Sequence, residues 1–258
     1  MSNVFKRWSI LVVALLISFL SSTAGTNHDP LRDSEVLALV AGAALPVNIA
    51  HEIAVRGLDF TPDAAFRSQL RAAGADDAVF AALKVAKISA SGAANDKAHQ
   101  QLLQHLATAG KLMGAKKYDA AAIELNGAID SGSDSPAVGF VMGEVLRATE
   151  RHSEAVAVYA ELLKQNRGFP EAHTKLSYNL YRTGEPDEAL REAKLAIAEN
   201  PGNPEAHKNL GLAFEDMRKF DAAAAEFQEA LRLKPDYAIK LERRAKSIQS
   251  PAAQASPD

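Results

Sequence analysis

The chain has 258 residues, of which 47% are hydrophobic and 24% charged, a composition typical of a folded protein of one or two domains. It contains no cysteine, which excludes a disulfide scaffold, a thiol nucleophile, a cysteine zinc site, an iron–sulfur cluster and lipid attachment through cysteine. The formal net charge of −3 provides no overall field that would attract nucleic acid or an anionic membrane.

Residues 1–24 have the pattern of a secretory signal peptide. Lys6 and Arg7 precede an apolar run over residues 8–20, and Ser22 and Ala24 place small side chains at the −3 and −1 positions of a cleavage site. The run is shorter than the roughly 20 residues that span a bilayer. We therefore expect cleavage after Ala24 and an exported protein, periplasmic or extracellular. An uncleaved, membrane-anchoring signal is the alternative.

Residues 31–87 carry four short apolar-periodic segments that are bounded by helix start and stop signals. The predicted starts are Ser34, Pro46, Thr61-Pro62-Asp63 and Asp76-Asp77, and the predicted stops are Gly42, Gly57 and Gly74. We therefore expect a small helical module, for which the sequence suggests no activity. Residues 88–96 lack apolar periodicity and are predicted to form a flexible linker.

From residue 102 onward the sequence repeats every 34 residues, with copies at 102–135, 136–169, 170–203 and 204–237. In the last copy, positions 7, 8, 11, 17, 20, 24, 27 and 32 are occupied by Leu210, Gly211, Phe214, Phe220, Ala223, Phe227, Ala230 and Pro235. This pattern resembles the signature of the tetratricopeptide repeat (TPR). The resemblance implies that each copy is a pair of antiparallel helices and that the copies stack into a superhelix.

The packing of such helix pairs requires small side chains where the backbones approach, and position 20 is alanine in all four copies. We therefore predict an all-α fold, a TPR-type α-solenoid of four helix-turn-helix repeats over residues 97–249. Its last segment, 238–249, is predicted to be a capping helix, and residues 250–258 are predicted to be a disordered tail.

The resemblance also places positions 2, 5, 9, 12 and 13 of each first helix on the concave face of the solenoid. In the second to fourth copies these positions combine aromatic and basic side chains with acids, a composition found at interaction hot spots. The candidate groove residues are Phe140, Glu144, Arg147, Tyr178, Tyr181, Arg182, Lys208 and Leu212. The alternative is that these side chains are only solvated or pack between helices.

No catalytic, cofactor or metal site assembles from the sequence. His51-Glu52 begins like the HExxH zinc motif, but Val55 stands where the second histidine is needed. His173 and His207 occupy position 4 of successive copies, so their backbones should be roughly 10 Å apart, too far for one ion to be shared easily. Glycine-rich phosphate loops are also missing. We therefore expect no enzyme activity, no cofactor and no metal.

Two functions are compatible with these observations. The first is a non-enzymatic adaptor or scaffold of the cell envelope that holds a peptide or a partner helix in the concave groove. The second is recognition of an envelope polymer such as a cell-wall glycan, with aromatic side chains stacked on sugar rings. The sequence favours the adaptor, with a protein or peptide as partner. It indicates no nucleic acid partner and no membrane contact beyond an uncleaved signal anchor, and it leaves the oligomeric state open.

Overall fold

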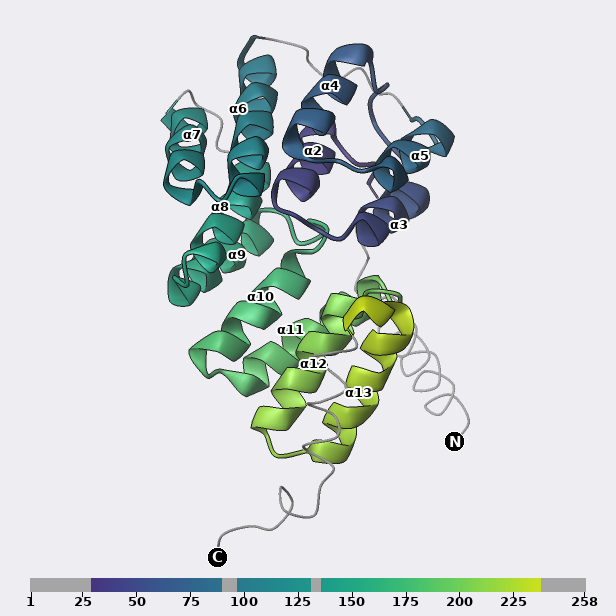
Figure 1. The fold of residues 1–258 in the computed structure, drawn as a ribbon, viewed down its shortest axis with the longest axis vertical. Helices are drawn as coiled ribbons and strands as arrows, with labels where there is room; N and C mark the ends of the chain where they lie inside the picture. Colours follow the sequence, from purple (N-terminus) through teal and green to yellow (C-terminus); the bar gives the residue numbers. More distant parts are fainter. Residues whose placement is uncertain (1–28, 90–96, 131–135, 238–258) are drawn as a thin grey trace, which may run out of the picture.

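The structure is a computed structural model that describes residues 29–89, 97–130 and 136–237. Over these residues it consists of α-helices and one 3-10 helix, Pro235–Tyr237, with only isolated β-bridges. The helices form a module of four and an array of four pairs (Figure 1). None of the described helices has the length and apolarity needed to cross a membrane. The predicted signal peptide, capping helix and tail lie outside the described residues.

The module begins and ends its helices close to the predicted signals. It contains α2 (Asp33–Ala41), α3 (Pro46–Arg56), α4 (Ala64–Ala73) and α5 (Asp77–Val85). The Asp63 and Asp76 carboxylates accept hydrogen bonds from the first turns of α4 and α5, which satisfies backbone donors there. Ser34, however, is not the cap of α2. That role belongs to Arg32, whose backbone N–H donates to the Glu35 carboxylate at 3.0 Å.

Two short backbone contacts close the module on itself. Leu58 forms bridges with both Leu31 and Ile88, so the beginning and the end of the module are held beside the same residue. The Ser89 N–H also donates to the Leu58 carbonyl, at 2.8 Å. Residues 88 and 89 therefore belong to the module and not to the predicted linker, whose other residues, 90–96, are outside the described part.

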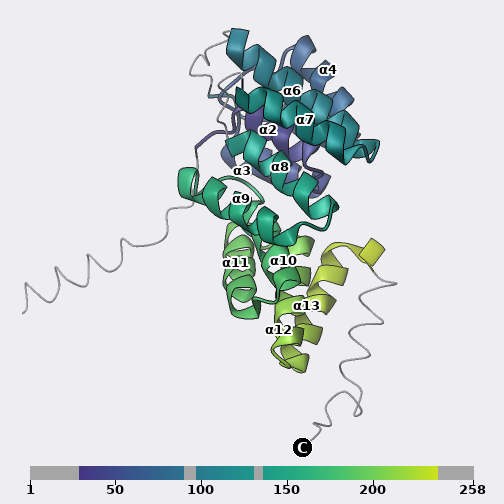
Figure 2. The same ribbon diagram turned by 90° about the vertical axis from the view of Figure 1, so that its left-hand side faces the viewer.

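The array contains four helix pairs. Its pairs are α6 (Lys97–Gly114) with α7 (Tyr118–Asp130), α8 (Pro136–Ala148) with α9 (His152–Gln165), α10 (Ala172–Thr183) with α11 (Pro186–Glu199), and α12 (Pro204–Asp216) with α13 (Phe220–Leu233). Figure 2 shows the pairs stacked along the long axis of the molecule. The all-α solenoid predicted from the sequence is confirmed.

Small residues allow the two helices of a pair to approach. A Cβ atom built on Gly143 would lie 2.5 Å from the Tyr159 ring, and one on Gly211 would lie 2.5 Å from the Phe227 ring. Both glycines occupy position 8, so the large ring of the second helix fills the space that a side chain on the first helix would take. The position 20 alanines, Ala121, Ala155, Ala189 and Ala223, are all fully buried.

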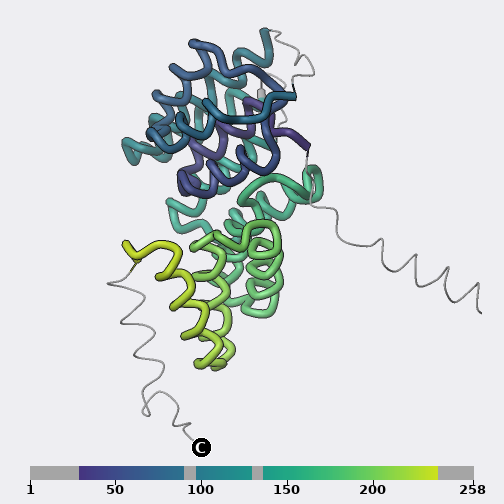
Figure 3. The backbone as a smooth tube through the Cα atoms, turned by 90° about the vertical axis from the view of Figure 1, so that its right-hand side faces the viewer, coloured from purple at the N-terminus to yellow at the C-terminus, as the bar shows by residue number. Residues whose placement is uncertain are grey.

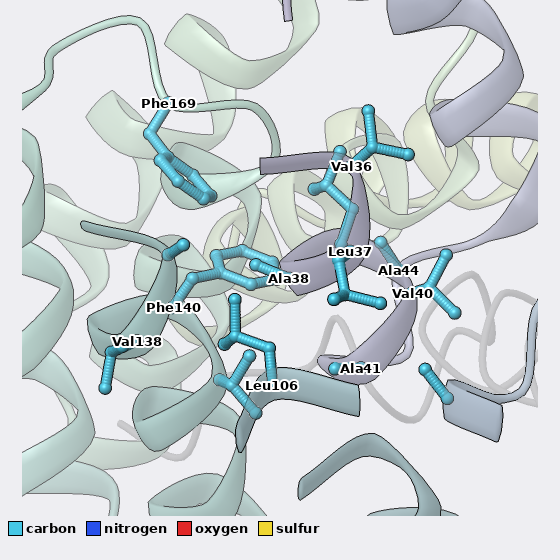
Figure 4. Close-up of a cluster of buried hydrophobic side chains, with 14 of the residues drawn as sticks. Val36, Leu37, Ala38, Val40, Ala41, Ala44, Leu106, Val138, Phe140 and Phe169 are labelled. Carbon is cyan, nitrogen blue, oxygen red and sulfur yellow. The ribbon is translucent and has the colours of Figure 1, made fainter. Parts of the chain in front are cut away.

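The module packs on the first helices of the array. Helix α2 contacts α6 and α8, and α4 contacts α6. In Figure 3 the module lies beside the upper part of the array, with the last repeat below it. Leu37, Ala38 and Ala41 of α2 lie near Leu106 of α6 and Phe140 of α8, and all five side chains are buried (Figure 4). Module and array thus share one hydrophobic core.

Replacement of Phe140 by alanine tests this shared core. Because Phe140 is fully buried, we expect Phe140→Ala to lower the free energy of unfolding by about 3–5 kcal/mol, measured by urea denaturation. The control is Ile123→Ala on α7, where the side chain is 72% exposed and the expected loss is about 0.5 kcal/mol or less. Equal losses for the two variants would contradict the packing of α2 on α8.

Candidate functional site

The concave face of the array has a covered half and an open half. Phe140, in the covered half, was predicted to line the groove. This prediction is wrong, because α2 lies over its side chain. Its ring stacks on Phe169 with the ring centroids 5.2 Å apart, and a Cβ atom on Gly42 would lie only 2.6 Å from it. A partner that approached the first two repeats would therefore meet α2 and not Phe140.

The open half holds a pocket between α8, α10 and α12, of about 190 Å3, enough for one side chain. Four of the predicted groove residues line it, namely Glu144, Arg147, Tyr178 and Lys208. The others that line it are Ala43, Thr174, Lys175, Glu205 and Asn209. Ala43 follows the C-terminal end of α2, so the module forms one wall of the pocket.

The three remaining predicted residues surround Tyr178. Arg182 donates a hydrogen bond to the Tyr178 hydroxyl at 3.0 Å and forms an ion pair with Glu150 at 2.7 Å. The Tyr181 ring centroid lies 6.4 Å from that of Tyr178. Leu212 is buried and packs in a small cluster with both tyrosines. It therefore helps to position the tyrosines and offers little surface to a partner.

Buried charges form the floor of the pocket. The Glu144 carboxylate is 1% exposed and accepts hydrogen bonds from the Tyr159 hydroxyl at 2.8 Å and from Arg147 at 3.0 Å. The Lys175 ammonium lies between Glu205, at 3.3 Å, and Glu144, at 3.9 Å. Burial alone would lower the pKa of Lys175, but these carboxylates raise it well above its ordinary value. Lys175 is therefore charged at every physiological pH.

Aromatic rings flank the cation at the open side of the pocket. The Lys208 ammonium lies 5.5 Å from the centroid of the Tyr178 ring and 5.7 Å from that of Tyr237. Tyr237 was not predicted as a site residue, because it follows the second helix of its repeat. The one feature of the sequence that could have indicated Tyr237 is its place as an aromatic residue two positions after Pro235, which closes the repeat.

An unpaired acceptor lies in the wall of the pocket. Asn209 is 2% exposed, and its Nδ2 donates to the Thr174 carbonyl at 2.9 Å and to the Ser177 hydroxyl at 3.0 Å. Its Oδ1 is buried and, within the described residues, accepts no hydrogen bond. Such an atom costs about 1–3 kcal/mol unless water or a ligand supplies a donor. Asn209 was missed from the sequence because it occupies position 6, outside the positions assigned to the concave face.

Three histidines join the two helices of their own repeats. His105, His173 and His207 all occupy position 4, and their Nδ1 atoms lie 2.6–2.8 Å from Glu124, Glu192 and Glu226 at position 23 of the same repeats. In the described part of the chain, no three His, Asp or Glu side chains are grouped so that they could hold a metal ion. These histidines therefore have a structural role in linking helices.

The buried Lys175 provides a test of the charged floor. Replacement by methionine should lower the free energy of unfolding by about 3–5 kcal/mol, because Glu144 and Glu205 would then be buried without their shared cation. The unfolding midpoint in urea measures the loss. Lys164→Met is the matched control, since that lysine is 73% exposed and pairs with Glu161 at the surface. If both variants were equally stable, Lys175 would not neutralise the pocket floor.

Comparisons with known proteins agree with this architecture. Residues 140–204 and 174–238 match the tetratricopeptide repeat family. One similar solved structure is MamA 41-end from Desulfovibrio magneticus RS-1, with 19% identity and a TM-score of 0.54 over 62% of this chain and 87% of that chain. Another is YrrB, described as a TPR protein with an unusual peptide-binding site, with 18% identity and a TM-score of 0.51 over 80% of this chain and 92% of that chain. At these identities the likeness concerns the fold. Residues 140–238 therefore carry tetratricopeptide repeats, and the described helices of the array form an α-solenoid.

Proposed function

We propose that this protein is a non-enzymatic adaptor or scaffold that binds a peptide or a partner helix in the open half of its concave face. The observation that carries the proposal is a pocket that presents Tyr178 and Lys208 and is also lined by Asn209, whose buried Oδ1 has no hydrogen-bond partner among the described residues. A peptide supplies N–H donors along its whole length, so it suits an unpaired carbonyl acceptor. YrrB, which has the same repeat fold, is itself described as having a peptide-binding site.

The structure limits the length of chain that the groove can hold. Because α2 covers α6 and Phe140 of α8, the partner contacts mainly α10, α12, the Glu144 and Arg147 end of α8, and the Tyr237 end of the array. Tyr178 and Tyr237 offer rigid apolar surface, and Lys208 offers a positive charge between them. This combination favours a short segment with both an apolar and an acidic side chain.

The same contacts give less support to glycan recognition. A sugar ring would stack on an open tyrosine face, whereas Arg182 and Lys208 already lie 5.9 Å and 5.5 Å from the Tyr178 ring centroid. Sedimentation with isolated cell-wall material separates the two functions, because a peptide adaptor would remain in solution.

Peptide display on the whole protein tests the groove. Random peptides would be selected on the immobilised chain, and the dissociation constants of the selected peptides would then be measured by calorimetry. We expect Tyr178→Ala and Lys208→Ala each to weaken binding about tenfold or more, because both side chains lie at the centre of the open half.

Arg191→Ala is the control for these variants. Arg191 lies on the second helix of the third repeat, is exposed and pairs with Glu188 at 3.0 Å, so its loss should leave peptide affinity unchanged. Circular dichroism would establish that all variants keep the helical fold. Peptides that bind the Tyr178 and Lys208 variants as tightly as the natural chain would refute the groove model.

We also propose that the chain is exported after cleavage behind Ala24. The sequence has a single tryptophan, Trp8, and it lies in the segment that would be removed. The protein purified from an envelope fraction should therefore begin at Gly25 by mass spectrometry and show no tryptophan fluorescence. An intact Met1 with tryptophan emission would instead indicate a retained membrane anchor.

A further inference from the structure

Residues outside the pocket contact Tyr178 from the preceding repeat. Glu150 lies in the turn between α8 and α9, and His152 begins α9. Helix α9 packs on α10, which carries Tyr178, and Figure 2 shows the two helices one above the other. Neither Glu150 nor His152 is among the residues that line the pocket. Their effect on the pocket therefore passes through the side chains of α10.

One guanidinium group joins Glu150 to Tyr178. The Nη2 atom of Arg182 donates to the Glu150 carboxylate at 2.7 Å, and its Nη1 atom donates to the Tyr178 hydroxyl at 3.0 Å. Because a guanidinium is planar and rigid, a bond that fixes Nη2 also fixes the direction in which Nη1 donates. The Glu150 carboxylate thus orients Arg182 toward the tyrosine.

His152 contacts the same two residues. Its Nε2 atom lies 3.2 Å from the Glu150 carboxylate, and its ring meets the Tyr178 ring edge to face, with the centroids 6.1 Å apart. His152 is 8% exposed, and its Nδ1 atom lies 2.8 Å from the Oδ1 atom of Asn179. Since the Nδ2 atom of Asn179 donates to the Lys175 carbonyl at 2.8 Å, Oδ1 is the acceptor and Nδ1 is the donor. This bond fixes the imidazole ring against Tyr178.

Glu150 thus receives contacts from two repeats, from Arg182 of the third and from His152 of its own. The hydrogen bond from Arg182, together with that from His152, lowers the pKa of the Glu150 carboxyl below its ordinary value. The carboxylate is therefore ionised at neutral pH and remains an acceptor for both groups.

The backbone of the turn shows that the Glu150 side chain can be removed without harm to the fold. Position 15 of each repeat has a positive φ, at Lys116, Glu150, Gly184 and Arg218. The φ of Glu150 is 61°, in the left-handed region that glycine adopts more readily than other residues. The third repeat has glycine at this position, so the turn does not require a glutamate. Glu150→Gly therefore removes the carboxylate and leaves the turn in a conformation that suits it.

We propose that Glu150 and His152 are positioning residues of the groove, which hold the Tyr178 ring in the orientation that the partner meets. The inference rests on the proposed function, because it names residues that set the affinity of the same site. A tyrosine without these contacts can rotate about its side-chain torsions, and a partner would then have to order it on binding. With the contacts in place, the ring is ordered on folding. The second repeat thus contributes to recognition without touching the partner.

Fluorine NMR of the whole chain tests the network without any partner. All five tyrosines would be replaced by 3-fluorotyrosine, and the Tyr178 line would be identified by its absence in Tyr178→Phe. We expect Glu150→Gly and His152→Gln each to shift that line, because the ring loses a contact that fixes its orientation. Lys116→Gly, at the same position of the first repeat, is the matched control and should leave the line unchanged.

A double-mutant cycle measures the effect on binding. With peptides selected for the groove, we expect Glu150→Gly to raise the dissociation constant about threefold to tenfold, as for the ordering of one side chain, and Lys116→Gly to leave it unchanged. In the Tyr178→Phe background, which lacks the hydroxyl that Arg182 contacts, Glu150→Gly should have little further effect. Additive effects would show that Glu150 acts on the partner directly and would overturn the proposal.

The two measurements separate this proposal from the proposed function. If the Tyr178 line shifts in Glu150→Gly but no peptide binds the natural chain, the groove model is wrong and the contacts of Glu150 serve only the fold, which overturns the positioning role. If peptides bind through Tyr178 while Glu150→Gly changes neither the line nor the affinity, the groove model holds and the positioning role is again overturned.

Discussion

The packing of α2 across α6 and α8 is the contact on which the other features depend. It buries Phe140 and Leu106 and joins the module and the array in one core. It also fixes where α2 ends, and Ala43 just beyond that end becomes a wall of the pocket. The next helix, α3, is thereby brought to the loop that precedes α10, where Arg56 donates to the Gly168 carbonyl at 3.0 Å. One apolar contact thus determines which half of the concave face is covered and where the open half begins.

The buried ion pairs of the pocket floor, unlike the apolar contact of α2, contribute more to geometry than to stability. Buried ion pairs such as Lys175 with Glu205 gain little net stability, because the desolvation of both charges offsets most of their attraction. They define geometry instead, since a carboxylate without its cation would be strongly unfavourable in the same place. The floor of the pocket is therefore held in one arrangement, and rigid polar groups of this kind lower the ordering cost of binding.

The sequence predicted the helices well, because their signals are local. Proline, glycine and acidic caps mark the ends of the module helices. The alanines and glycines of the repeats lie where the two helices of one pair approach closely, which is also a local contact. It did not predict that the module covers the groove. An aromatic residue at position 5 has the same local pattern whether it meets a partner or another part of its own chain, as Phe140 does. Asn209 and Tyr237 were missed for a similar reason, since their burial depends on neighbouring helices and not on their own.

The residues at position 5 explain why the module stops where it does. They run Leu106, Phe140, Thr174 and Lys208 from the first repeat to the fourth. The first two are apolar and gain free energy when α2 removes them from water. The last is a cation whose ion-pair partner, Glu205, lies 4.0 Å away, and an apolar helix laid over it would remove its charge from water without adding a new partner. The side chain at position 5 thus changes from apolar in the first two repeats to charged in the fourth. This change limits α2 to the first two repeats and leaves the groove around Lys208 open.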